Sequence, residues 1–204
     1  MIEHLTTTST DGLAIVLSPL LPAEAERVFE LCQDPDIQRW TTVPSPYSMD
    51  DAVSYVRDYT PPAWRQVADG TFSLRDEGPE LVWAVRLLGG PLEGLWGSLG
   101  LKRPKPGLTE IGWWLGAGAR GHGVMRAAVA KILEVAIDPA GELKAQAVWW
   151  FAMQGNEASC AIAQRTGFTF RGLVADSPHG PTPVLAAVIH QGDPIAPVSG
   201  WPVA

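Results

Sequence analysis

Cysteine, basic residues and long apolar runs are all scarce in this chain of 204 residues. Its 2 cysteines, Cys32 and Cys160, cannot form a disulfide framework, so a reduced, cytoplasmic protein is the simpler interpretation. No segment approaches the roughly 18 consecutive apolar residues that a membrane span needs. The opening residues, MIEHLTTTSTDG, lack the basic and apolar regions of a secretory signal. We therefore expect a protein that neither spans a membrane nor is secreted.

The charge balance is acidic, with 15 Lys and Arg against 22 Asp and Glu and a net charge of −7. Nucleic-acid binding needs a basic surface against the phosphates, so this class of partner is disfavoured. An acidic protein suits a cationic substrate such as an amine, although acidity also serves solubility alone. The histidines lack the spacing of metal ligands, so no metal site is predicted. They are His4, His122, His179 and His190.

The apolar pattern predicts a mixed, mostly antiparallel α/β (α+β) sheet of about six to seven strands, flanked by about four helices. Strands are expected at residues 12–20, 80–88, 94–102, 108–116, 145–152, 168–175 and 183–190. Helices are expected at 21–34, from Ser48 onward, at 124–137 and at 156–167. Ser48 and Asn156 are predicted N-caps, and Gly167 follows the last helix as its C′ residue. We expect one domain over residues 1–190, followed by a proline-rich tail at 191–204.

A glycine-rich loop joins the expected strand at 108–116 to the expected helix at 124–137. Glycines let the backbone approach a ligand closely, and the N–H groups at a helix N-terminus attract anions. From residue 111 to residue 133 every ionisable group is basic: Arg120, His122, Arg126 and Lys131. The segment therefore predicts an anion site, with a ligand-free structural turn as the alternative.

Two common phosphate loops are excluded by the residues present. No Gly-Lys-Ser/Thr follows Gly121 and Gly123, so the loop is not a Walker loop. The dinucleotide motif G-x-G-x-x-G fails because Arg126 stands where its last glycine should be. The spacing that fits is Arg-x-x-Gly-x-(small or Met), over residues 120–125.

That spacing resembles the pyrophosphate loop of the GNAT superfamily of acyl-CoA N-acyltransferases. EIGWWLGAGARGHGVM is similar to the strand, loop and helix of this family, and NEASCAIAQRTGFTFRG to the segment that follows. DPDIQRWTTVPSPYSMDDAVSYV resembles the N-terminal segment of one branch, the RimJ/RimL-type ribosomal-protein N-terminal acetyltransferases. The three pieces occur in the expected order and cover most of residues 10–190.

The resemblance implies a GNAT fold, with a sheet splayed in the middle and acetyl-CoA lying in the splay as cosubstrate, without a metal. Backbone groups of Trp114, Leu115 and Gly116 would contact the pantetheine arm. The amides from Gly121 to Met125 would hold the pyrophosphate, with Arg120 at its rim. The cofactor-binding set implied is Trp114, Leu115, Gly116, Arg120, Gly121, His122, Gly123, Val124, Met125 and Asn156.

The resemblance also implies direct attack of an amine on the thioester, which needs an acid and a base. Many relatives use a tyrosine late in the chain as acid, but here the tyrosines all lie upstream of residue 60. RimL-like enzymes use the serine of Asn-x-x-Ser, here Ser159. Glu110 is the candidate base, because strand alternation puts it on the same face as Gly112 and Trp114. Its rivals lie in the preceding loop and are Asp76, Glu77 and Glu80.

We therefore predict an N-acetyltransferase that acts on a primary amine, either a protein N-terminus or a small molecule. Succinyl or another acyl group is an open alternative to acetyl. A non-catalytic acyl-CoA-binding module is a second hypothesis, and a scaffold whose tail, with Trp201, binds a partner is a third. The sequence leaves the oligomeric state open between a monomer and a homodimer.

Overall fold

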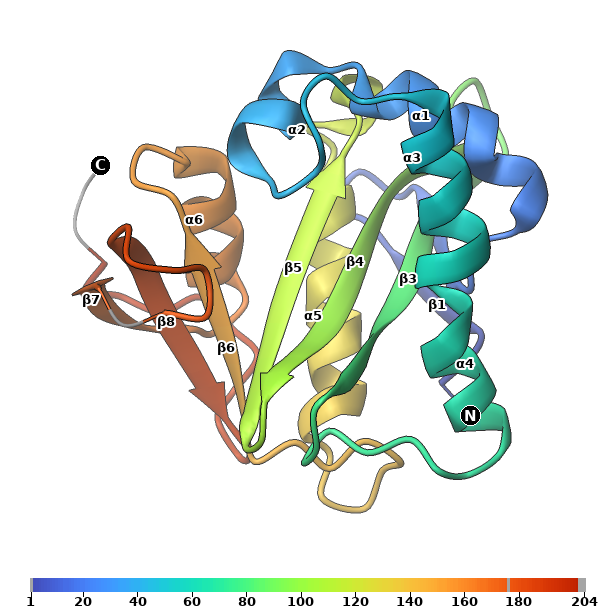
Figure 1. Ribbon diagram of the computed structural model, residues 1–204. Coiled ribbons are helices and arrows are strands. Elements are labelled where there is room, and N and C mark those ends of the chain that lie inside the picture. The colour runs from blue at the N-terminus through green and yellow to red at the C-terminus, as the bar shows by residue number, and fades with distance from the viewer. Residues whose placement is uncertain (1, 176, 202–204) are drawn as a thin grey trace.

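One twisted sheet organises the chain in the computed structural model, which describes residues 2–175 and 177–201 (Figure 1). The strand order is β1-β2-β3-β4-β5-β6-β8-β7, and β5–β6 is its parallel pair. The strands are β1 Leu5–Thr8, β2 Ala14–Ser18, β3 Gly78–Leu88, β4 Gly94–Lys105, β5 Leu108–Leu115, β6 Ala147–Ala152, β7 Thr169–Val174 and β8 Val184–His190. The expectation of a mixed, mostly antiparallel sheet is confirmed. The number of strands was underestimated, because β1 was not predicted.

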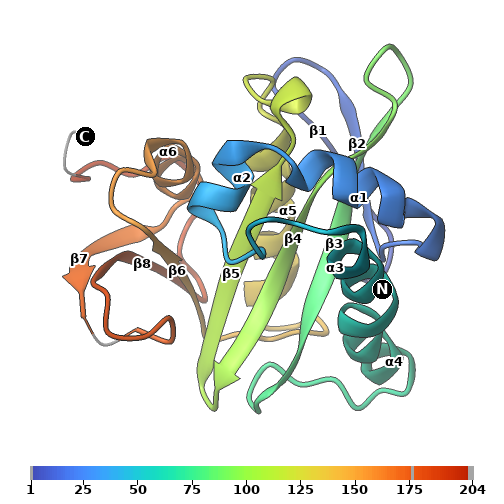
Figure 2. The ribbon, with the colours of Figure 1, turned by 45° about the horizontal axis from the view of Figure 1, so that its top comes forward.

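Helices cover both faces of the sheet, and Figure 2 shows α1, α2 and α3 on the near side with α5 behind. The α-helices are α1 Ala25–Cys32, α2 Pro35–Trp40, α3 Met49–Ser54, α4 Pro61–Ala68, α5 Val124–Ile137 and α6 Glu157–Arg165. Short 3-10 turns at Pro22–Glu24 and Ala117–Ala119 precede α1 and α5, and a π-helical turn at Tyr55–Tyr59 follows α3. None of the helices within residues 2–175 and 177–201 is long and apolar enough to cross a membrane.

Two clusters of buried side chains fix the helices to the sheet. Behind the sheet, α5 buries residues such as Val129 and Ile132 against strand residues such as Ile111. On the near side, Val28 of α1 and Ala52 of α3 pack with strand residues that include Trp114. Alternate residues of β5 therefore belong to different clusters. This alternation decides which part of the site each side chain can reach.

The predicted caps are confirmed. Ser48 Oγ accepts a hydrogen bond from the backbone N–H of Asp51, and the Asp51 carboxylate accepts one from the backbone N–H of Ser48, which makes a capping box. Asn156 Oδ1 accepts from the backbone N–H of Ser159, 3.2 Å away. Gly167 follows the C-cap of α6 with a φ of 98°, a left-handed conformation that favours glycine. These contacts fix where α3 and α6 begin and where α6 ends.

The helix count was too low because two proline-initiated helices were not predicted. Pro35 and Pro61 occupy the first turns of α2 and α4, where their missing N–H groups cost nothing. Asp34 caps α2 by accepting a 2.9 Å hydrogen bond from the backbone N–H of Asp36. The proline-broken stretch is therefore helical, and α2 comes to lie over the end of β5 (Figure 2).

The sheet splays between β5 and β6. The two strands pair in parallel at a single register position, Glu110 opposite Trp149. Figure 1 shows them meeting at one end and separating toward the other. The crossover through α5 leads from one strand to the other. The edge of β5 beyond Glu110 that faces β6 is therefore left without a partner strand, which confirms the splay that the sequence resemblance implied.

Candidate active site

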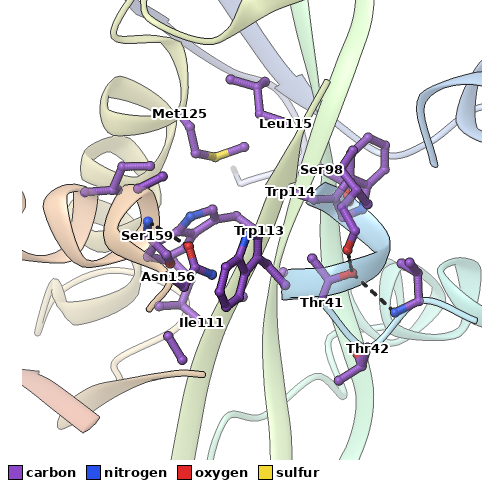
Figure 3. Close-up of a pocket in the computed structure, with 18 of the residues that line it drawn as sticks. Thr41, Thr42, Ser98, Ile111, Trp113, Trp114, Leu115, Met125, Asn156 and Ser159 are labelled. Atoms are coloured by element: carbon purple, nitrogen blue, oxygen red, sulfur yellow. Dashed lines mark hydrogen bonds between the residues drawn. The ribbon is translucent and has the colours of Figure 1, made fainter. Parts of the chain in front are cut away.

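A cavity of about 1190 Å³ fills the splay. Its walls come from β4 and β5, the N-terminus of α5, the end of β6 with α6, and the segment from α2 to α3. Figure 3 shows Met125, Asn156 and Ser159 on one side, Thr41, Thr42 and Ser98 on the other, and Trp113 between them. Of the residues that the sequence analysis assigned to cofactor binding and to catalysis, all but Gly116 and His122 line this cavity.

The pairing of β5 with β4 decides which backbone groups face the cavity. The backbone N–H of Gly116 donates to the carbonyl of Trp96 on β4, 2.7 Å away. Hydrogen-bonded positions alternate along an antiparallel pair, so the polar groups of Trp114 also point to β4. Those of Trp113 and Leu115 point to the open edge. The cavity-facing backbone is therefore Trp113 and Leu115, whereas the sequence analysis named Trp114, Leu115 and Gly116.

The glycine loop leads directly into α5. Gly121 and Gly123 have φ values of 82° and 71°, in the left-handed region. A side chain on Gly123 would collide with the hydroxyl of Thr10, so this position needs glycine for space as well as for conformation. No side chain caps the N-terminus of α5, and Val124 and Met125 line the cavity. The first N–H groups of the helix are thus available to an anion.

The basic residues of the loop are paired, which the sequence did not indicate. Arg120 donates to the Asp34 carboxylate at 2.6 Å and to Asp36 at 3.2 Å. Its Nε also donates to the carbonyl of Leu115, 3.0 Å away. His122 Nδ1 lies 3.0 Å from a carboxylate oxygen of Asp11. The segment that lacks acidic residues in sequence is therefore surrounded by three carboxylates in space.

Arg126, in the first turn of α5, lines the same cavity. Within residues 2–175 and 177–201 its guanidinium makes no hydrogen bond and no ion pair. Lys131, one and a half turns further on, is paired with Glu134 at 3.0 Å. Arg126 is thus the free cation beside the loop, and it was not among the predicted site residues. Its signal in the sequence is its place three residues after Gly123.

Ser159 and Asn156 lie together at the start of α6 (Figure 3). Ser159 Oγ accepts a hydrogen bond from the indole Nε1–H of Trp150, 3.0 Å away. Among the described residues the Ser159 hydroxyl has no acceptor for its own proton, and the Asn156 side-chain NH₂ has no acceptor either. Both groups line the cavity as unused hydrogen-bond donors.

Glu110 is buried at the floor of the cavity. Its side chain belongs to the near face of β5, as alternation predicted, and the residue is only 3% exposed. One carboxylate oxygen lies 2.9 Å from His179 Nε2, from the loop between β7 and β8. The other is buried with no hydrogen-bond partner among the described residues. A buried carboxylate oxygen without a donor is costly, so this atom is suited to receive one from a ligand or a water.

Of the three rivals to Glu110, Glu80 lines the cavity, whereas Asp76 and Glu77 are exposed outside it. The hydroxyl of Tyr59 donates to Glu80 at 2.7 Å. Burial raises the pKa of Glu80, and the nearby Glu110 carboxylate raises it further, while Lys102 and Tyr59 oppose the shift. Burial also raises the pKa of Tyr55, whose hydroxyl lies 3.0 Å from Ser98 Oγ. The sequence analysis had set these tyrosines aside as too far upstream, yet both line the cavity.

Neither a metal cluster nor an activated thiol stands out in the parts of the chain that the structure describes. No group of three His, Cys, Asp or Glu residues is arranged to hold a metal ion there. Burial raises the pKa of the Cys160 thiol, which keeps it protonated at neutral pH. The groups of the cavity that could exchange a proton include the hydroxyl of Ser159 and the carboxylates of Glu80 and Glu110.

A splayed sheet, an open strand edge and an uncapped helix N-terminus come together in one cavity. The family model that describes the acetyltransferase (GNAT) domain matches residues 14–169. The chain belongs to this family. No curated protein gives a significant sequence match.

Solved structures of several acetyltransferases share the fold. RimL, the ribosomal L7/L12 alpha-N-protein acetyltransferase in complex with coenzyme A, has a TM-score of 0.66 at 15% identity, over 90% of this chain and 95% of its own. RimJ of Mycobacterium smegmatis, in complex with CoA-disulfide, has 0.67 at 16% identity, over 92% and 86%. The microcin C7 self-immunity acetyltransferase MccE, in complex with acetyl-CoA and AMP, has 0.65 at 18% identity, over 86% and 92%. The resemblance to RimJ and RimL that the sequence suggested thus extends to the fold.

We predict that Glu80→Gln raises the Tm relative to the parent chain, and that this difference in Tm is larger at neutral pH than at acidic pH. A raised pKa means that the folded state favours the protonated carboxyl, so stability is lost as pH rises above the ordinary value of 4.5. Glutamine removes this loss and can still accept the hydrogen bond from Tyr59. The measurement is the Tm of both proteins from pH 4.5 to 7.5, with the exposed Glu93→Gln as control. A Tm difference that does not grow with pH would contradict the assignment.

Proposed function

We propose that the protein transfers an acetyl group from acetyl-CoA to a primary amine, by direct attack of the amine on the thioester. The observation that carries this proposal is the continuity of the site. The unpaired edge of β5 runs directly into the uncapped N-terminus of α5 within a single cavity. An extended amide-bearing chain that ends in a pyrophosphate is the ligand that such a surface complements.

In this proposal the pantetheine arm pairs with the backbone of Trp113 and Leu115. The pyrophosphate binds the amides from Gly121 to Met125, and Arg126 supplies the cation that Arg120 and His122, paired with carboxylates, cannot. Asn156 donates its free NH₂ to the arm from the opposite wall. The structures of MccE and RimL, which hold acetyl-CoA and CoA, support a ligand of this class.

We assign the acid to Ser159 and the base to Glu110. The amine nitrogen attacks the carbonyl carbon, the C–S bond breaks, and the leaving thiolate takes the Ser159 proton. The amine proton passes, directly or through water, to the buried free oxygen of Glu110, and Glu110 then returns it through water to the Ser159 oxygen, so that both groups regain their starting states. A backbone N–H on the open edge of β5 polarises the carbonyl oxygen. Glu80, with its raised pKa, is the alternative base.

The acceptor is proposed to enter from the side formed by α2, α3 and the tyrosines. Glu80, which Tyr59 contacts, and Glu110 at the floor of the cavity both suit an amine that arrives as a cation. A protein N-terminus and a small amine both meet this requirement. A protein that only binds acyl-CoA would keep the loop and strand edge but would have no need of a buried unpartnered carboxylate.

Binding of acetyl-CoA is the first expected outcome, measured by isothermal titration alongside succinyl-CoA and ATP. A CoA thioester should bind and ATP should not, because only the former has an arm for the β5 edge. Gly123→Ala should weaken binding at least tenfold, since a methyl group there meets Thr10 in a left-handed backbone. The control is Gly107→Ala, which has a similar φ of 76° but open space around it. Absence of binding to every CoA species would remove the proposed function.

Ser159→Ala should lower turnover while leaving acetyl-CoA affinity within about twofold. General acid catalysis contributes about 10²- to 10⁴-fold, so a loss of at least about tenfold in kcat is expected. The measurement is thiol release from acetyl-CoA with the best amine from a panel of unblocked peptides and small amines. Unchanged turnover would exclude Ser159 as the acid.

Glu110→Gln should remove the acidic limb of the pH–rate profile of kcat/KM, in which the rate rises as the base loses its proton, because the amide cannot accept the amine proton. The matched control is Glu77→Gln, an exposed carboxylate outside the cavity. If the profile of Glu110→Gln is the same as that of the parent chain, the base is not Glu110. The same experiment on Glu80→Gln then decides whether that carboxylate takes its place.

A further inference from the structure

A tryptophan stands directly behind the proposed acid. Trp150 of β6 is 1% exposed, and its only polar atom donates to Ser159 Oγ at 3.0 Å. Its ring stacks on Trp113, with centroids 6.5 Å apart and planes 20° apart. On another side it meets Trp201, with centroids 5.6 Å apart. Trp150 thus lies between the cavity wall and the C-terminal segment of the chain.

The C-terminal segment after β8 folds back to reach this position. The backbone N–H of Val198 donates to the carbonyl of Gln164 on α6, 3.1 Å away. Trp201 Nε1 donates to the carbonyl of Phe168 at 2.9 Å, and its ring lies 5.0 Å from that of Phe170. The segment is therefore fixed to the end of the helix that carries Ser159.

Close packing at Gly167 holds the C-terminal segment against the end of α6. A side chain on Gly167 would collide with the carbonyl of Pro194, so the backbone of the segment lies directly on the C-terminus of α6. Trp201 and Ile195 also pack against the main core cluster. Trp201, which could have served a partner protein, is instead used within its own chain. Pro194, Ile195 and Trp201 lie outside residues 14–169, the part that the family model matches.

The hydrogen bond from Trp150 determines what the Ser159 hydroxyl can do. A hydroxyl has one proton to donate and two lone pairs, and an indole N–H can only donate. Because Trp150 is the donor in this hydrogen bond, the Ser159 hydroxyl must donate its own proton to another group. None of the described residues accepts that proton, so the hydroxyl is free to donate it into the cavity. A helical serine released from such a contact can turn to the carbonyl four residues earlier, which would use the proton unproductively.

We propose that Trp150 and Trp201 are positioning residues for Ser159, and that the C-terminal segment is part of the active site. Trp150 orients the hydroxyl so that its proton points to the leaving sulfur. Trp201 fills the space behind Trp150 and so keeps the indole N–H within reach of the hydroxyl. This inference rests on the proposed role of Ser159 as the acid. It changes the expected division of the chain, because residues 191–201 then belong functionally to the domain.

The test is a double-mutant cycle in the full chain, with thiol release from acetyl-CoA as the assay. Trp150→Phe and Trp201→Ala should each lower kcat about fivefold to tenfold, with KM for acetyl-CoA within about twofold. In a Ser159→Ala background, either change should lower kcat by no more than about twofold further, because the group that they position is gone. Trp201→Phe, which keeps an aromatic ring, should recover most of the activity.

The matched control is Trp64→Phe. This tryptophan also donates its indole N–H within the protein, to the carbonyl of Val82 at 2.8 Å, but it does not line the cavity. Its replacement should lower the Tm and leave kcat unchanged. A general loss of stability would therefore be separated from a loss of positioning.

The NMR signal of the Trp150 indole N–H gives a second measurement of positioning, and this one needs no amine substrate. In ¹H–¹⁵N spectra of tryptophan-labelled protein, Trp150→Phe identifies its signal. Ser159→Ala and Trp201→Ala should both shift this signal and speed its exchange with solvent at least tenfold, whereas Trp64→Phe should leave it in place.

The outcomes separate the two proposals. Normal turnover in Ser159→Ala would overturn the acid role itself. If Ser159→Ala is impaired but Trp201→Ala is not, or if Trp201→Ala lowers kcat by the same factor with and without Ser159, the positioning role is overturned. An unshifted Trp150 signal in Trp201→Ala would overturn it as well.

Discussion

The single register contact between β5 and β6 is the constraint on which the site depends. Backbone N–H and C=O groups need partners, and a strand normally obtains them from both neighbours. Here β5 pairs with β4 from Glu110 to Leu115, but its backbone pairs with β6 only at Glu110 opposite Trp149. The unpaired edge beyond this point is tolerated because a cavity, and not protein, lies against it. The proposed site for an extended ligand thus exists because the edge of β5 that faces β6 is left unpaired.

The same contact places the proposed catalytic groups. Glu110 is the last residue of β5 before the strands separate, so its carboxylate lies at the closed end of the splay. Trp149 and Trp150 are adjacent in β6 and point to opposite faces, and only the second reaches Ser159. The proposed base therefore lies on β5, whereas the proposed acid lies on α6 and is held by a hydrogen bond from β6. Their separation is fixed by the angle of the splay, and the intervening space is where the acyl group must lie.

Local rules in the sequence were enough to predict most of the fold. Ser48, Asn156 and Gly167 were recognised because a cap depends on a few neighbouring residues. Strand β1 was missed because its sequence, LTTT, carries a single large apolar residue, and its pairing with β2 is a tertiary contact. Helix α2 was missed because prolines suggest a break, although Pro35 follows a capping aspartate and starts a helix.

The site was predictable in outline but not in its partners. The glycine loop and Ser159 were recognised from short motifs, and Glu110 from strand alternation. Gly121, Gly123, Ser159 and Glu110 all line one cavity. The sequence analysis named Trp114, and replacing it with Trp113 required the register with β4, which one strand alone does not specify. Likewise, the carboxylates around Arg120 and His122 come from residues about 80 and 110 positions earlier in the chain. Long-range pairing of this kind leaves no trace in a local charge pattern.

Arg120 has a consequence for how the two halves of the cavity work together. Its guanidinium is held by Asp34 and Asp36, at the start of α2, and by the carbonyl of Leu115 at the end of β5. Arg120, the first residue of the proposed phosphate loop, is thus bound to the helix whose following segment lines the proposed acceptor side of the cavity. A shift of the loop on binding a phosphate would be transmitted to that wall. By linkage, the acceptor would then change the affinity for the donor by the same factor that the donor changes the affinity for the acceptor. The ion pairs of Arg120 thus provide a route by which donor and acceptor could sense each other without touching.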